Sequence, residues 1–260
     1  MRPGYTLGLF LLGLALAGIP LAGTTNAEVL LTSGHVDVAV NYDGRGWEFG
    51  VHDDESGNEY EPDEATLVVP YSGRIVRPSS SAFDFLGVPV GGHIWVLPQN
   101  EDPDLLFLGI ASEETNPALF SAWSPGDPRL PAGNFKWLRW NLVSASTPLG
   151  GHFSMFSVGS FGDPLLWMST FDNPNDNSFF QLVGSHSHVN WAFTAAGTYE
   201  LTFQVTAMLA DGSMTTSDEG TFRFRVMGPS AAVPEPSSVV LAVTGVGLIA
   251  GLRLRRRRAV

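Results

Sequence analysis

Two histidines one residue apart are the most distinctive chemical feature of this chain. They are His186 and His188 in "HSHVNWAF", and the whole sequence contains only six histidines. On a β-strand, residues i and i+2 point to the same side, so both imidazoles can face one ion. Zinc in proteins normally has four ligands, or three ligands and a water. The pair therefore predicts half of a site for zinc or another transition metal, and the alternative is a solvated strand that happens to carry two histidines.

The remaining ligands would have to come from elsewhere in the chain. We expect His152, in "GHFSMFS", to be the third ligand, followed as candidates by His35 in "GHVDVAV" and His93 in "GHIWVLP". Asp37 shares a strand face with His35. Asp37 and Asn190 are the side chains that we expect to orient a ligand ring by hydrogen bonding from outside the metal's ligand set.

Other chemistry finds less support in the sequence. An enzyme would need a nucleophile with its base, a carboxylate pair or an open metal site. Serines lie beside histidines in "GSHSH" and "GHFS", but no Gly-x-Ser-x-Gly motif follows a strand. No carboxylate pair is singled out by its spacing. We therefore expect a protein that is not an enzyme.

Three loops are rich in Asp, Glu, Asn and Pro: residues 52–65, 98–104 and 171–177. Carboxylate and amide oxygens are the ligands that Ca²⁺ prefers, so each loop is a conceivable calcium site. None has the spacing of a known calcium loop. Solvated turns are the favoured interpretation, and His52 is expected to belong to the first of them.

Composition limits the partners. The chain has no cysteine, which excludes disulfides and cysteine-ligated metals. Its 14 basic residues are unevenly placed, because six of them lie near the two ends; the segment 28–228 holds 8 basic against 25 acidic residues. A segment with a net charge of −17 repels nucleic acid, so we expect no nucleic-acid partner and a preference for cations.

Short segments of alternating polarity predict an all-β fold. The clearest pair is 197–208 and 220–226, in which one face is apolar and the other is polar. No stretch of the segment 28–228 has apolar residues at helical spacing. We predict an antiparallel sandwich of two sheets, immunoglobulin-like or related, that fills residues 28–228.

Residues 1–27 have the features of a signal peptide. Arg2 precedes an apolar run from Leu7 to Leu16, and the small residues around Ala27 suit a cleavage site. We therefore expect export of the protein and processing by signal peptidase.

The C-terminus has three parts in a fixed order: a linker at 229–238 with the sequence "VPEPSS", an apolar stretch that starts at Val239, and a basic end. This order resembles the PEP-CTERM sorting signal. The resemblance implies a hydrophobic helix with an Arg-rich tail at 239–260, an exosortase-type processing enzyme as partner, and transient anchoring in the inner membrane of a Gram-negative bacterium. The final location would be the cell envelope or the extracellular matrix. The residues that carry it are Pro234, Glu235, Pro236, Arg255, Arg256, Arg257 and Arg258.

The segment 28–228 resembles the choice-of-anchor M proteins and the related surface-anchored domain first described in actinobacteria. The most specific match is the run from His186 to Phe193, and "GHFSMFS", "GHIWVLPQ" and "LTSGHVDVAV" add to it. The resemblance implies an exported, envelope-anchored β domain, found in some lineages beside transport systems of the metal-uptake type. It implies no enzymatic activity.

The prediction is an envelope-anchored binding or structural protein with a histidine metal site. The alternative is a protein that binds exopolysaccharide on exposed tryptophans, or a purely structural matrix protein. Trp137 and Trp140 are three residues apart and so fall on opposite faces of a strand, which predicts that at most one of them lies in the core.

Overall fold

The computed structural model describes residues 28–173 and 177–229. The predicted signal peptide, the sorting motif and the C-terminal helix with its Arg-rich tail lie outside the described residues. Strands dominate, and three short 3-10 helices connect them: η1 (Tyr71–Gly73), η2 (Ser81–Leu86) and η3 (Pro117–Leu119). No helix among the described residues is long and apolar enough to span a membrane.

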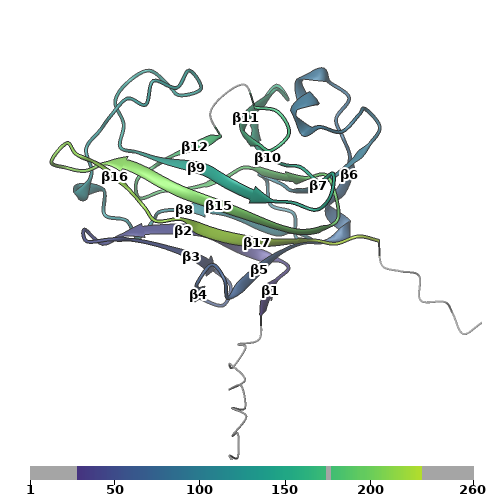
Figure 1. Ribbon diagram of the computed structural model, residues 1–260, viewed down its shortest axis with the longest axis horizontal. Helices are drawn as coiled ribbons and strands as arrows, with labels where there is room; N and C mark the ends of the chain where they lie inside the picture. The colour runs from purple at the N-terminus through teal and green to yellow at the C-terminus, as the bar shows by residue number, and fades with distance from the viewer. Residues whose placement is uncertain (1–27, 174–176, 230–260) are drawn as a thin grey trace, which may run out of the picture.

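The two strands predicted at 197–208 and 220–226 are present, together with many others (Figure 1). The strands are β1 (Val29–Leu31), β2 (Gly34–Tyr42), β3 (Trp47–Asp53), β4 (Asn58–Tyr60), β5 (Ala65–Val69), β6 (Arg74–Val76), β7 (His93–Leu97), β8 (Leu106–Ala111), β9 (Trp137–Ser146), β10 (Phe153–Val158), β11 (Pro164–Ser169), β12 (Ser178–Leu182), β13 (His186–His188), β14 (Asn190–Phe193), β15 (Gly197–Met208), β16 (Met214–Thr216) and β17 (Gly220–Val226).

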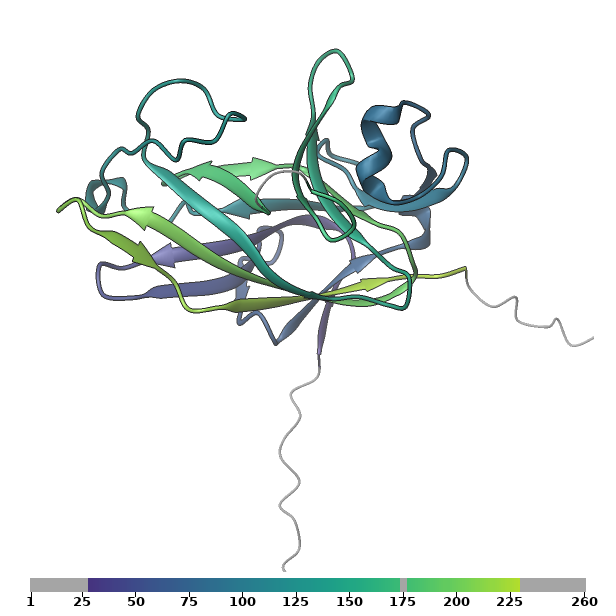
Figure 2. The same cartoon turned by 45° about the horizontal axis from the view of Figure 1, so that its top comes forward.

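The strands form three sheets. The largest has the order β1-β5-β17-β15-β9-β12, with β16 paired to β15; the second is β11-β10-β14-β7-β6, and the third is β13-β8-β2-β3-β4. The largest sheet packs against both others. Phe49 of the third sheet contacts Trp140 and Phe222, and Trp191 of the second contacts Phe203 and Phe224. The second and third sheets thus share one layer of a sandwich-like, mostly β fold, which Figure 2 shows from a tilted direction.

The expectation of purely antiparallel sheets is wrong, because two of the three sheets are mixed. β5 runs parallel to both β1 and β17, and β2 runs parallel to β8. Alternation of polar and apolar residues shows which face of a strand is buried, but it carries no information about the direction of the neighbouring strand. Parallel neighbours must be joined by a crossover, and here the partners are distant in sequence.

The prediction about the two tryptophans of β9 is also wrong, because both are buried. Trp140 is 1% exposed in the core between the layers, whereas Trp137 is 8% exposed on the other face. That outer face is covered: Trp137 packs on Phe135 and Phe180, and its carbonyl accepts a hydrogen bond from the Trp123 indole. A loop folded over the sheet therefore buries a residue that alternation would leave exposed.

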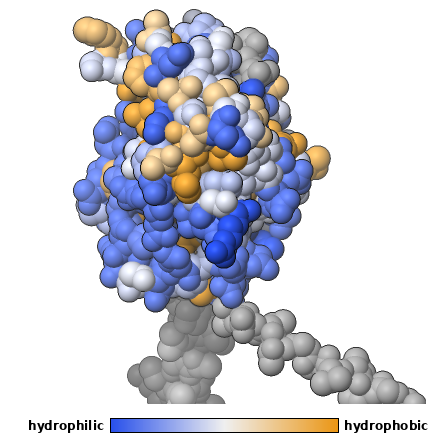
Figure 3. Space-filling view, turned by 90° about the vertical axis from the view of Figure 1, so that its left-hand side faces the viewer, coloured by the Kyte–Doolittle hydropathy of each residue, from blue (hydrophilic) through white to orange (hydrophobic). Residues whose placement is uncertain are grey.

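One end of the molecule, on the left in Figure 1, has a surface with a hydrophilic and a more hydrophobic part. Hydrophilic residues cover its lower part, and hydrophobic side chains gather above them (Figure 3). The chemistry described next lies on the outer, solvent-facing side of the third sheet.

Candidate metal centre

The alternation of β2 places its polar residues on the outer face of the third sheet. Val36, Val38 and Val40 are almost fully buried in the core. His35 and Asp37 alternate with these valines and so point the other way. Asp37 is nevertheless only 2% exposed, which means that neighbouring side chains cover it.

β8 lies between β2 and β13, and its pairing with both strands determines which of their residues are opposite one another. Gly109 of β8 is opposite Asp37 on one side and opposite His188 on the other. A Cβ atom at Gly109 would be 2.0 Å from Asp37 Oδ1 and 3.1 Å from His188 Cε1. Only glycine leaves room for these side chains to meet above β8.

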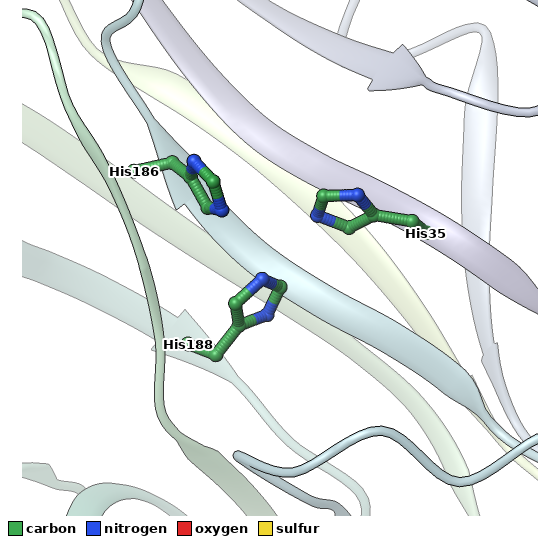
Figure 4. A group of neighbouring side chains, drawn as sticks. All are labelled: His35, His186 and His188. Atoms are coloured by element: carbon green, nitrogen blue, oxygen red, sulfur yellow. The ribbon is translucent and has the colours of Figure 1, made fainter.

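Three histidines converge over this gap (Figure 4). One ring nitrogen from each of His35, His186 and His188 lies within 4.8 Å of the others, and the ring centroids are 5.0 to 5.6 Å apart. His35 comes from one side of β8 and the histidine pair from the other, and the three rings point toward one another. This cluster could hold a metal ion.

Several polar atoms in the cluster are buried without a hydrogen-bond partner. They are His35 Nε2, Asp37 Oδ1 and His188 Nδ1. The first two are 3.6 Å apart. Buried polar groups are nearly always paired, because an unpaired one costs free energy that water would otherwise supply. The cluster therefore contains polar atoms that lack the partners a bound ligand would supply.

The outward-facing nitrogens of the cluster are held by carboxylates. His35 Nδ1 pairs with Asp54 Oδ2, and His186 Nδ1 lies 3.0 Å from Glu113 Oε1. Asp54 is held in turn by His52 Nε2 at 3.0 Å. In metal sites, a carboxylate on the second ring nitrogen fixes the ring and raises the basicity of the ligand nitrogen. His35 and His186 are therefore arranged to present Nε2 to an ion.

Burial decides the charge of the inner groups. Burial, together with the nearby His35 and His186, lowers the pKa of His188 to about 4, although a contact with the backbone of Leu108 acts in the opposite direction. The His188 ring also stacks on Phe107 at 3.7 Å. Burial raises the pKa of Asp37, while the neighbouring His35 acts in the opposite direction. A neutral His188 is the form that binds a metal.

The other predicted site residues lie elsewhere. His93 begins β7 and His152 precedes β10, both in the second sheet, and neither belongs to a convergent group among the described residues. His152 contacts Phe171 instead. Asn190 pairs its amide with Gln99 and with the carbonyl of Phe156, so it orients no histidine. The third histidine of the cluster is thus His35, and not His152 as expected.

Sequence reasoning missed Gly109, Asp54 and Glu113. A glycine inside the apolar run "LLFLGIA" is a recognised sign of a close approach across a strand, and that signal was available. Asp54 lies in the acidic loop 52–65, where nothing in the sequence distinguishes it from the other carboxylates. Glu113 follows β8, and only the pairing of β13 with β8 brings it to His186.

Comparison of the chain with family models, curated protein sequences and solved structures found no match.

Proposed function

We propose that this protein binds a divalent transition-metal ion, with zinc as the first candidate, through His35, His186 and His188. The observation that carries the proposal is the convergence of one ring nitrogen from each of His35, His186 and His188 to within 4.8 Å of one another, beside a glycine that leaves room for the side chains. Imidazole nitrogens are ligands that suit zinc. The negative surroundings add electrostatic attraction for a cation.

The wider setting of the proposal comes from the sequence. The signal-peptide features at 1–27 and the resemblance of 229–260 to a PEP-CTERM sorting signal support an exported protein that is processed at the inner membrane and retained in the envelope or matrix. The finer assignment of the fold, an immunoglobulin-related sandwich, is supported by Tyr199, whose hydroxyl bonds to the backbone of Ala195 as in the tyrosine corner of such domains.

Exopolysaccharide binding is the weaker alternative because it needs an exposed aromatic platform. All seven tryptophans lie in the described residues, and each is buried or half-buried.

The test is metal content, measured by mass spectrometry on the purified protein produced without a histidine tag. We expect close to one metal ion per chain, and a loss of the ion in His186→Ala/His188→Ala. The matched control is His93→Ala/His152→Ala, which removes two histidines outside the cluster and should keep the metal. Equal trace metal in all three proteins would overturn the proposal and leave the structural role.

A further inference from the structure

A pocket lies beside the histidine cluster on the same outer face. Its floor is one row of small residues across three neighbouring strands, because Ala39 of β2 is opposite Gly50 of β3 and Ala111 of β8. The next row along the strands contains Asp37 and Gly109 of the metal cluster. The small side chains leave a cavity of about 460 Å³, which is within the size range of small-molecule sites.

The walls of this pocket are acidic. Its lining includes no lysine or arginine, and besides Asp37 it contains six carboxylates from β3, β4 and the segments that follow β4 and β8: Glu48, Glu59, Glu61, Glu64, Glu113 and Glu114. A concave surface of one sign focuses the electrostatic field and favours ligands of the opposite charge. The pocket therefore favours a cation.

Asp37 provides a second, independent indication of a ligand. Its residue is 2% exposed, it lines the end of the pocket beside the histidines, and its Oδ1 has no hydrogen-bond partner. A buried carboxylate oxygen without a donor is a site for an ammonium group as well as for a metal.

The spacing of the carboxylates argues against a single inorganic ion in the pocket itself. Among the described residues, ligand atoms converge in groups of three only around His35. The glutamates are distributed around the cavity instead, over an uncharged floor. Such an arrangement matches positive charges that are separated by an apolar spacer.

We propose that this pocket binds a small organic cation with at least two amino groups joined by an alkyl chain. One ammonium group would lie toward Asp37 and another among the glutamates, with the alkyl chain over Ala39, Gly50 and Ala111. This inference goes beyond the metal site and does not depend on it.

The test is calorimetric titration of the full chain with 1,4-diaminobutane and spermidine, with butylamine and 1,4-butanediol as matched probes. We expect saturable binding of one diamine per chain, weaker binding of the monoamine and none of the diol. Glu48→Gln/Glu61→Gln/Glu114→Gln removes three wall charges and should weaken diamine binding about tenfold. Ala39→Leu, which fills the floor, should also weaken it.

The matched control for charge is Glu101→Gln/Asp104→Asn/Asp163→Asn, which changes net charge equally outside the lining and should bind within about twofold of the parent. Thermal unfolding checks that each variant is folded. Diamine binding retained by His186→Ala/His188→Ala separates this pocket from the metal proposal. Equal weakening in the wall and control variants, or binding of Mg²⁺ that matches the diamine in affinity and variant pattern, would overturn the inference.

Discussion

Gly109 defines the geometry of the candidate metal centre as much as the histidines do. It lies in β8 between Asp37 and His188, and the absent side chain leaves space for Asp37 Oδ1 and for the His188 ring. A methyl group at this point would touch both side chains.

Gly109→Ala should therefore abolish the site without removing any ligand. We expect metal affinity to fall by a factor of about ten or more, and the free energy of unfolding to fall by about 1–3 kcal/mol through overpacking. The control is Gly46→Ala, where an added Cβ meets nothing within 4 Å. Equilibrium metal titration and urea unfolding measure both effects, and unchanged affinity in Gly109→Ala would contradict this account of the site.

The buried His188 ring should make the stability of the metal-free protein depend on pH. Its pKa is lowered from 6.5 to about 4, so the unfolded chain takes up this proton first as the pH falls. The contribution of His188 to the free energy of unfolding is present above pH 6.5 and is lost between pH 6.5 and about 4. The raised pKa of Asp37 acts in the opposite sense, since protonation of Asp37 on acidification favours the folded state.

Urea unfolding in the presence of a chelator, at a series of pH values, measures this dependence. His188→Gln removes the titrating ring, so its stability should change less than that of the parent between pH 6.5 and 4. Parallel curves for the two proteins would show that His188 is not held neutral by the fold.

The sequence allowed some of these residues to be identified and not others. The spacing of His186 and His188 predicted that both share a face, and the same spacing of two predicted this for His35 and Asp37. Which of the four remaining histidines joins them depends on the pairing of both β13 and β2 with β8. The spacing of residues within one strand does not indicate which strands pair with it.

At the scale of elements, Tyr199 ties the start of β15 to the turn before it. Its buried hydroxyl donates a hydrogen bond to the Ala195 carbonyl at 3.0 Å and accepts one from the Ala195 amide at 3.1 Å. Gly151 packs against this hydroxyl so closely that a Cβ there would be 2.7 Å away. The glycine before His152 is thus explained by its packing against Tyr199.

Tyr199→Phe should cost about 1–3 kcal/mol of unfolding free energy, because it leaves partly buried backbone groups of Ala195 unpaired. Tyr71→Phe is the matched control, since Tyr71 is 43% exposed and loss of its hydroxyl should change stability by less than about 0.5 kcal/mol. Urea unfolding of the two variants compares them. Similar losses in both would argue against a structural role of the corner.

The positions of the long strands could be predicted from the sequence, whereas the pairing of strands into sheets could not. The long alternating runs of β2, β15 and β17 were evident because one face of each is buried. β13 is only three residues long and continues almost directly into β14 in another sheet, so the run from His186 to Phe193 did not indicate two strands. The parallel pairs depend on contacts between segments far apart in sequence.

At the scale of the whole molecule, bound metal should raise the stability of the fold. A ligand that binds only the folded state at about 1,000 times its Kd adds about 4 kcal/mol to the free energy of unfolding. For a domain of this size, that corresponds to a rise in Tm of about 10 °C.

Thermal unfolding with and without added zinc tests this expectation. The rise should be absent from His186→Ala/His188→Ala and retained by His93→Ala/His152→Ala. A similar rise in both double variants would place the zinc outside the cluster.

Because of the position of β13, a bound ion would also affect how the second and third sheets are held together. His186 and His188 belong to the third sheet, and Asn190–Phe193 continue the same chain into the second sheet. An ion held jointly with His35 of β2 would link β13 to β2 across β8, next to the point where the chain passes from the third sheet into the second. Metal binding would therefore stabilise the contact between these two sheets.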